Sequence, residues 1–298
     1  MEIKQYLNEQ RLLVEQALSE FMPHAQGLFN HHIEAMRYSL FAGGKRVRPI
    51  LCLAAGRAIN DTPELERALL PAACSLEYIH TYSLIHDDLP AMDDDELRRG
   101  KPTNHMCFGE AGAILAGDGL LTLAFDLLSD PELNTLPPER QMAIIHCIAR
   151  AAGSEGMVGG QALDIANENQ EFPFETLRAI HRSKTGALIK ASVLAGALGA
   201  GADQQQLQAL DGYGRQIGLA FQIVDDLLNA TATTDQLGKA AGSDAQRGKA
   251  TYPAFFGIDE TRNKAREAVQ AALTALNSFD QKAEPLRGLA RYIETRSH

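Results

Sequence analysis

The chain has 298 residues, of which 45% are hydrophobic, so it is long enough to bury a sizeable apolar core. Its formal net charge of −10 argues against nucleic acid as a partner, because proteins that bind a phosphate backbone present basic surfaces. The polar first residues predict no signal peptide, and no uncharged apolar run reaches the ~18 residues of a membrane span, so we expect a cytoplasmic protein without stable membrane insertion. The four cysteines form no CxxC pair, so we expect them to be reduced thiols.

Apolar residues recur at helical spacing along most of the chain, and Pro, Gly and Asp mark the breaks. The predicted helices cover residues 3–20, 33–40, 49–58, 64–86, 107–129, 138–152, 154–167, 173–181, 183–198, 204–228, 259–277 and 283–296, with a polar loop over 229–252. No strand-like alternation of useful length and no low-complexity linker appears. We therefore predict an all-α fold in which residues 1–298 form a single domain, a bundle of about ten or more helices around a central cavity.

The most informative stretch reads IHDDLPAMDDDELRRGKPTNH and covers residues 85–105. Asp87 and Asp88 end a long apolar helix, and Asp93 follows after a short loop. So many carboxylates repel one another unless a cation lies between them, and oxygen ligands without cysteine select a hard ion such as Mg²⁺. The stretch therefore predicts a magnesium site, although a motif of this kind that stands alone in a sequence is more often an acidic surface loop.

A second carboxylate pair, Asp225 and Asp226, ends the other long apolar helix at 204–228. Two such pairs facing each other could hold several Mg²⁺ ions on one diphosphate. Gln222 precedes Asp225 by three residues, and His80 precedes Asp87 by seven, so each shares a helix face with its aspartate. For both side chains a site role and an ordinary structural role are equally compatible with the sequence.

Basic residues fall into groups that suit a bound anion, since guanidinium and ammonium groups bind phosphate. One group follows a glycine turn that opens a helix, one follows the acidic stretch, and one lies in the second half of the chain. They are Lys45 and Arg48 after Gly43-Gly44, then Arg98 and Arg99, then Lys184, Lys239 and Lys249. Gln161 and Asp164, three residues apart in a glycine-rich helix, are interpreted as supporting or structural.

At these residues the chain resembles the short-chain trans-isoprenyl diphosphate synthases, which add isopentenyl diphosphate head-to-tail to allylic diphosphates. The resemblance runs over nearly the whole chain. It rests on GGKRVRP (43–49), the stretch from 79 to 105, FGEAGAILAGD (108–118), GGQALD (159–164), KTGALI (184–189), GLAFQIVDDLL (218–228) and GKATYP (248–253). The family is typically homodimeric, so a homodimer is expected by resemblance.

The resemblance implies roles for individual residues. Three Mg²⁺ ions on the allylic diphosphate would be ligated by Asp87, Asp93 and Asp225, with support from Asp88 and Asp226. The same diphosphate would contact Arg98, Lys184 and Lys239, with Lys249 as a further substrate-binding residue. The diphosphate of isopentenyl diphosphate would be held by Gly44, Lys45, Arg48, His80 and Arg99. Thr185 and Gln222 would face the developing carbocation and, with Lys184, make up the catalytic group.

The second aspartate motif departs from the family pattern, which usually reads DDxxD. Here the last position is Asn229, which offers a metal no charge. Direct metal ligation from position 229 is therefore in doubt, and Asp244 in the following loop is a possible auxiliary.

Tyr82 lies five residues before Asp87, about 7.5 Å along the helix axis, where its ring can meet a growing chain. In the resembled family an aromatic residue here accompanies fifteen-carbon products, so farnesyl diphosphate is the expected product, with Tyr82 and Ser83 setting its length. Three alternatives stay open: a geranylgeranyl diphosphate synthase, a non-catalytic partner subunit of a heteromeric prenyl synthase, and a hard-cation binding protein without catalysis. The last lacks the DxDxDG spacing of a calcium loop and gives the basic clusters no role.

Overall fold

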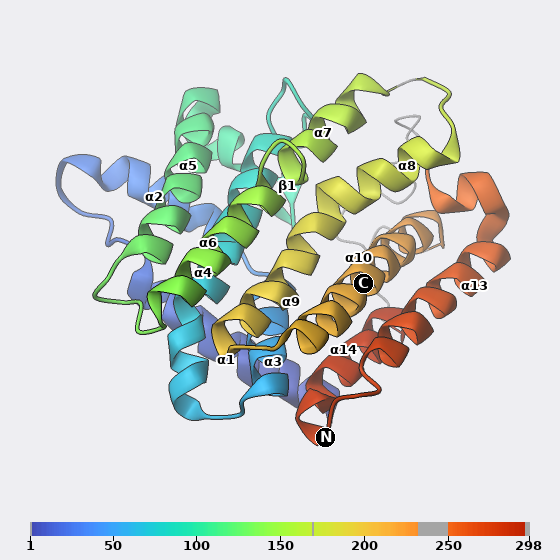
Figure 1. The fold of residues 1–298 in the computed structure, drawn as a ribbon. Helices are drawn as coiled ribbons and strands as arrows, with labels where there is room; N and C mark the ends of the chain where they lie inside the picture. The colour runs from blue at the N-terminus through green and yellow to red at the C-terminus, as the bar shows by residue number, and fades with distance from the viewer. Residues whose placement is uncertain (1, 169, 232–249, 296–298) are drawn as a thin grey trace.

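The computed structural model describes residues 2–168, 170–231 and 250–295, and these are almost entirely helical (Figure 1). In chain order the helices are α1 (Ile3–Phe21), α2 (Asn30–Leu40), α3 (Val47–Ile59), α4 (Pro63–Asp87), α5 (Asn104–Ser129), α6 (Pro138–Ala152), α7 (Met157–Ala166), α8 (Phe174–Ile180), α9 (Ala187–Ala200), α10 (Gln204–Thr231), α13 (Tyr252–Ala275) and α14 (Glu284–Thr295). Short helical turns are η1 (Gly27–Phe29), η2 (His181–Gly186) and η3 (Gln281–Ala283). The all-α prediction is confirmed.

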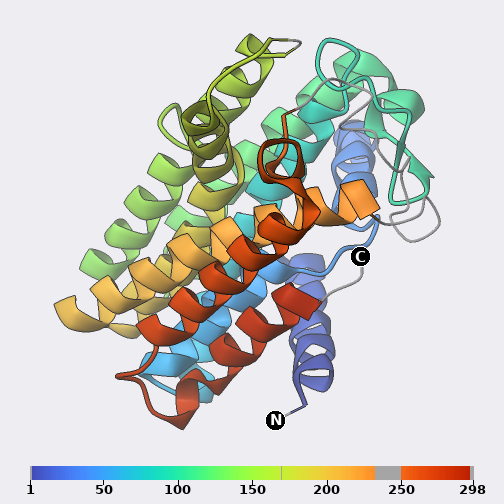
Figure 2. The ribbon, with the colours of Figure 1, turned by 90° about the vertical axis from the view of Figure 1, so that its right-hand side faces the viewer.

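The helices bury two neighbouring apolar clusters. One gathers around α4, α5 and α6, and the other around α10, α13 and α14. Helices α3 and α9 contribute to both clusters. They pack so closely together that a side chain at Gly196 would meet the backbone of Cys52. Figures 1 and 2 show α6, α9, α10 and α13 running side by side. Residues near the carboxyl-terminal ends of α4 and α10 line one cavity.

Three local features differ from the sequence-based prediction. A small antiparallel hairpin pairs β1 (Leu97–Arg98) with β2 (Lys101–Pro102) through a turn in which Arg99 and Gly100 both have positive φ. The loop predicted over 229–252 is shorter at both ends, since α10 continues through Thr231 and α13 begins at Tyr252. A π-helical turn, η2, joins α8 directly to α9.

Helix α5 is long and apolar enough, by length and composition, to cross a membrane, and it is the one such helix within the described ranges. It packs along α4 and α2, so part of its apolar surface belongs to the core. On its outer side Met106, Ile114 and Leu115 are exposed.

Candidate active site

Helices α4 and α10 bring the two carboxylate motifs to one cavity of about 430 Å³. Asp87 and Asp93 line one side, and Asp225 and Asp226 line the other. Arg98, Lys184, Thr185, Gln222 and Asn229 complete the polar wall of this cavity, which we call the diphosphate cavity.

The loop after α4 folds back onto the helix end and brings Asp93 close to Asp87. The backbone N–H of Asp93 donates to the Asp87 carbonyl at 2.8 Å, and that of Asp95 donates to the Asp88 carbonyl at 3.2 Å. Burial raises the pKa of Asp87 to about 6, an effect that Lys184 partly offsets and Asp93 reinforces. The protein alone therefore stabilises the ionised carboxylate poorly, and a bound cation would stabilise it.

Asp88 faces away from this cavity and holds the hairpin. Its buried carboxylate accepts from Arg98 Nε at 2.8 and 2.9 Å and from Arg98 Nη2 at 2.5 Å. Burial raises the pKa of Asp88, and the Arg98 hydrogen bonds act in the opposite direction. Because β1 carries Arg98, this ion pair fixes the guanidinium at the rim of the diphosphate cavity.

The second motif is organised in the same way. Asp226 is buried, and its two oxygens accept from Gln222 Nε2 at 3.1 Å and from the backbone N–H of Tyr252 at 2.9 Å. The carboxylate thus ties α10 to the first residue of α13. Asp225 and the buried Asn229 line the diphosphate cavity beside it.

The π-helical turn η2 supplies the third wall, and π-turns often mark functional sites because they redirect side chains within a helix. Lys184 Nζ donates to Asp164 Oδ2 at 2.7 Å, so Asp164 orients the ammonium group. His181 is buried with its ring stacked on Tyr252, and burial lowers its pKa to about 4, so the imidazole is neutral at physiological pH.

A second cavity of about 370 Å³ adjoins the first and shares Leu84, Asp87, Lys184 and Thr185 with it. Arg48 and His80 line its polar part. Burial lowers the pKa of Arg48 to about 10, so it stays charged, and its Nε is buried without a hydrogen-bond partner. An unsatisfied buried guanidinium nitrogen is costly and points to an anion at this position.

His80 is neutral in this environment, because burial and the neighbouring arginines, first among them Arg48, hold its pKa well below the usual value. The apolar part of the second cavity, which we call the chain cavity, begins at Tyr82 and Ser83. Its lining also includes His86, Met92, Met157, Val158, Gln161, Ala162 and Ile165. The ring of Tyr82 meets that of His86 edge-on at 5.5 Å between centroids.

The remaining predicted site residues divide into three groups. Arg99 donates through Nη1 to the Gly43 carbonyl and lies against Gly44, where a side chain would clash with the guanidinium. Lys45 is exposed and lines a separate hollow with Leu7 and Tyr292. Lys239, Lys249 and Asp244 lie outside the described residues.

Within those residues, no three His, Cys, Asp or Glu side chains converge as a closed metal site. The donor set nonetheless fits Mg²⁺, since it consists of oxygen ligands on two facing walls with charged nitrogen groups between them. An open arrangement of this kind leaves coordination positions for phosphate oxygens and water.

Several residues that contact the candidate active site were not predicted from the sequence, or were given too small a role. Asp164, taken as supporting or structural, pairs with Lys184 and lines the diphosphate cavity. His181 was missed, although its place three residues before Lys184 in one helical segment was a usable signal. The buried Arg46–Glu77 ion pair, at 2.7 Å beneath Arg48, had no sequence signal, because its partners lie 31 positions apart.

Comparison with known proteins agrees with this geometry. The polyprenyl synthetase family model matches residues 30–286. The farnesyl diphosphate synthase of Geobacillus stearothermophilus is 46% identical over 298 residues, covering 100% of this chain and 99% of that protein, and a geranylgeranyl diphosphate synthase of Cyanophora paradoxa is 46% identical over 294 residues, covering 98% and 96%. A crystal structure of an FPP/GFPP synthase from Zymomonas mobilis superposes with a TM-score of 0.86 at 38% identity, covering 98% of this chain and 99% of that one. The chain belongs to the polyprenyl synthetase family.

Proposed function

We propose that the protein is a trans-prenyltransferase that condenses isopentenyl diphosphate with dimethylallyl and geranyl diphosphate to give farnesyl diphosphate. The observation that carries this proposal is the pair of joined cavities. Two carboxylate motifs face each other across a polar cavity, and that cavity opens beside Asp87, Lys184 and Thr185 into an apolar one. A diphosphate with an attached hydrocarbon chain matches this division.

The allylic diphosphate lies between the two carboxylate motifs in this proposal. Asp87, Asp93 and Asp225 would hold Mg²⁺, with three ions expected, and the bound ions would supply positive charge to the leaving diphosphate. Arg98 and Lys184 add hydrogen bonds to the same group. Asp88 and Asp226 act indirectly, since one fixes Arg98 and the other fixes Gln222 and the start of α13.

The carbon–oxygen bond of the allylic substrate breaks, and the alkene of isopentenyl diphosphate attacks the resulting cation to form the new carbon–carbon bond. A proton then leaves the condensed product, with a departed diphosphate oxygen as its acceptor. Thr185 and Gln222 present oxygen atoms to the cation, and the apolar walls exclude water that would otherwise capture it.

Arg48, His80, Arg99 and Gly44 form the site for isopentenyl diphosphate in this proposal. The unpartnered Nε of Arg48 supports an anion there. Lys45 contributes only if its side chain turns from the separate hollow that it lines. Lys239 and Lys249 remain predicted substrate contacts by resemblance.

Farnesyl is the preferred product because Tyr82 lines the chain cavity and is almost fully buried, where its ring limits the length of a growing chain. A geranylgeranyl diphosphate synthase is the second candidate, since relatives of both names are equally similar to this chain. An inert partner subunit is disfavoured, because Asp87, Asp93, Lys184 and Asp225 all line one cavity.

We also infer that the enzyme works as a cytoplasmic homodimer, joined through the outer face of α5 and α6. Ile114 and Leu115 on α5 and Met142 on α6 are exposed, and Met142 retains 65% of its accessible surface. The two helices lie side by side on one flank of the molecule (Figure 1). Exposed apolar residues on two neighbouring helices suit a self-complementary contact with a second copy.

The proposal is tested with purified protein, Mg²⁺, labelled isopentenyl diphosphate and either dimethylallyl or geranyl diphosphate, with products sized by chromatography. We expect farnesyl diphosphate from both allylic substrates and no condensation when EDTA replaces Mg²⁺. Geranylgeranyl diphosphate as the main product supports the second candidate. No product from either substrate contradicts the assignment of a prenyltransferase.

A further inference from the structure

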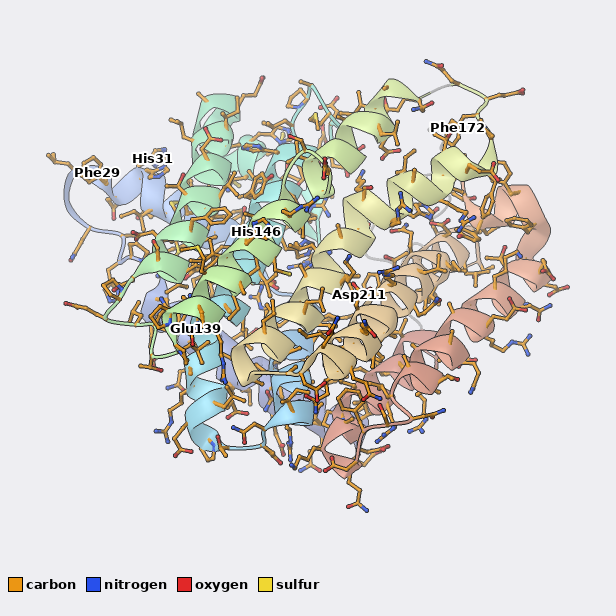
Figure 3. All side chains as sticks on the ribbon, in the orientation of Figure 1. Phe29, His31, Glu139, His146, Phe172 and Asp211 are labelled. Atoms are coloured by element: carbon orange, nitrogen blue, oxygen red, sulfur yellow. The ribbon has the colours of Figure 1, made fainter. Side chains whose placement is uncertain are left out.

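A groove of about 650 Å³ lies outside the two substrate cavities, on the outer face where the continuous segment α8–η2–α9 crosses α10. Asp211, labelled in Figure 3, marks this face of α10. The groove takes no part in the proposed reaction, and we call it the crossing groove.

Positive charge concentrates on its walls. Its cationic side chains are Arg178, Arg182, Lys190 and Arg215. Lys190 and Arg215 both form ion pairs with Asp211, at 3.4 Å for Lys190. Arg178 and Arg182 are exposed, and within the part of the chain that the structure describes neither makes a hydrogen bond or an ion pair. Two unpaired guanidinium groups on the wall of one groove, in a chain of net charge −10, are available to bind an anion.

The groove also contains two carboxylates, which limit where an anion can lie. Glu155 is engaged with Arg150 at 2.7 Å, and Glu175 is exposed at the end nearest the start of α8. Arg178 and Arg182 are one helical turn apart, so their Cβ atoms are about 6 Å from each other and their guanidinium groups can bind adjacent phosphoryl groups. This spacing favours a diphosphate over a single phosphate.

The floor of the groove is a close helix crossing. A side chain at Gly218 would meet the Cα of Gly186 at 3.0 Å, and one at Gly214 would meet the Cα of Lys190 at 3.1 Å. Small side chains at Ser183 and Ala187 leave the hollow open above this contact. Any ligand in the groove therefore lies directly on the contact between η2 and α10.

The same two segments carry catalytic side chains on their inner faces. Lys184 and Thr185 belong to η2, and Gln222 lies one turn beyond Gly218 on α10. His181 lines both the crossing groove and the diphosphate cavity, is about nine-tenths buried, and leaves its Nδ1 without a hydrogen-bond partner. Only one helix thickness separates the groove from the reacting groups.

We propose that the crossing groove is a regulatory site for a diphosphate group, bound by Arg178 and Arg182. A bound ligand bridges η2 and α10 from outside and changes how Lys184, Thr185 and Gln222 meet the substrate. Two ligands carry this group. One is inorganic diphosphate, which the proposed reaction releases, so this source rests on the proposed function. The other is a prenyl diphosphate, whose chain would lie along Ala179, Ala187 and Leu219.

The test measures binding of inorganic diphosphate by isothermal titration calorimetry to the wild type and to Arg178→Gln/Arg182→Gln, in the presence of Mg²⁺. The wild type is expected to bind diphosphate in the crossing groove in addition to the sites of the two substrate cavities. The double variant should lose the groove site, with at least about a tenfold drop in its affinity, and keep binding in the substrate cavities unchanged. Arg262→Gln/Arg266→Gln, an exposed pair at the same spacing on α13, is the matched control and should keep every site of the wild type.

Two further arms distinguish the source and the effect. If geranyl S-thiolodiphosphate binds the groove more tightly than inorganic diphosphate, the ligand is a prenyl diphosphate. If the two affinities are equal, the groove recognises the diphosphate group alone. In initial-rate assays, added diphosphate should inhibit the wild type partly without competition with either substrate, and the double variant should retain only inhibition that an excess of the two substrates relieves. Identical isotherms for wild type and double variant overturn the groove proposal. A wild type that binds diphosphate in the groove but forms no prenyl product contradicts only the proposed function.

Discussion

Among single residues, Asp87 shows most directly how the protein prepares for a cation. Its pKa is raised to about 6, mainly by burial, so folding disfavours the ionised form. The folded pKa lies above the unfolded one, so the contribution of this carboxyl to the stability of the metal-free protein falls as the pH rises from about 4 to 7. Asp87→Asn removes this contribution and leaves that of Asp88, whose pKa is also raised by burial.

We expect Asp87→Asn to raise the melting temperature in EDTA at pH 7 by a few degrees and to leave it nearly unchanged at pH 4. Turnover should fall by orders of magnitude, because a metal ligand is lost; Asp93→Ala should do the same. Melting curves at both pH values and product assays check this. Near-normal activity in either variant would show that these carboxylates do not hold the metal.

Asp225 and Asn229 lie one helical turn apart on the wall of the diphosphate cavity. Asp225→Asn is expected to damage turnover severely. Asn229→Asp should change it little, because position 229 is buried and a second carboxyl there is held largely protonated. Rates across a Mg²⁺ titration decide the matter. A large drop in the Mg²⁺ requirement of Asn229→Asp would make position 229 a ligand site.

Tyr82 lines the chain cavity against His86. Tyr82→Ala should lower stability by creating a void, and it should extend the product from farnesyl to geranylgeranyl diphosphate. Tyr78→Ala is the matched control, since Tyr78 lies one turn earlier and is fully buried in the core. That control should lose stability without a longer product. Farnesyl diphosphate alone from an otherwise active Tyr82→Ala would assign the length limit to Ser83 or another helix.

The sequence predicted the residues of the diphosphate cavity better than their individual roles. Apolar periodicity places Asp87 at the end of α4 and Asp225 in the last two turns of α10, so their meeting at one cavity was predictable. The engagement of Asp88 with Arg98 was not, because it depends on a turn that redirects the chain after the motif. The placement of Lys45 on another hollow likewise depends on the chain direction set by Arg46, whose φ is 51°.

At the scale of elements, Asp226 fastens α10 to α13. Its carboxylate accepts from the Tyr252 N–H and from Gln222. Asp226→Ala leaves the buried Tyr252 N–H unsatisfied, which costs about 1–3 kcal/mol, and removes the acceptor of the part-buried Gln222 amide. We expect a lower urea midpoint and faster amide exchange at Tyr252 and the first turn of α13.

Asp225→Ala serves as the control for this variant, because it removes the adjacent carboxylate while the Asp226 hydrogen bonds remain. It should impair turnover and leave exchange at Tyr252 slow. Equal exchange rates in wild type and Asp226→Ala would mean that other contacts hold the start of α13.

Long elements were predictable and short ones were not. The helices that carry the core have enough turns for periodicity to show, as in α4 and α10. The hairpin has two residues in each strand, too few for any alternation, and its only signal is Gly100 in the turn. The π-helical turn η2 differs from an α-helix by a small shift in hydrogen bonding, which residue spacing does not encode.

At the scale of the whole molecule, the exposed apolar face of α5 and α6 leads to a prediction about assembly. Leu115→Glu places a charge on this face and should convert the dimer to a monomer, measured by light scattering coupled to size-exclusion chromatography. Ile258→Glu changes an exposed apolar residue on α13 and should leave the dimer intact. A monomeric wild type would remove the basis for the inferred dimer.

The central claim is that the two carboxylate motifs act on one diphosphate. A crystal structure with Mn²⁺ and geranyl S-thiolodiphosphate tests it most directly, because anomalous scattering locates each metal ion. We expect manganese between the diphosphate and Asp87 with Asp93, manganese between the same diphosphate and Asp225, and the geranyl chain pointing toward Tyr82. Metal ions at one motif alone, or a diphosphate outside the cavity that the motifs share, would contradict it.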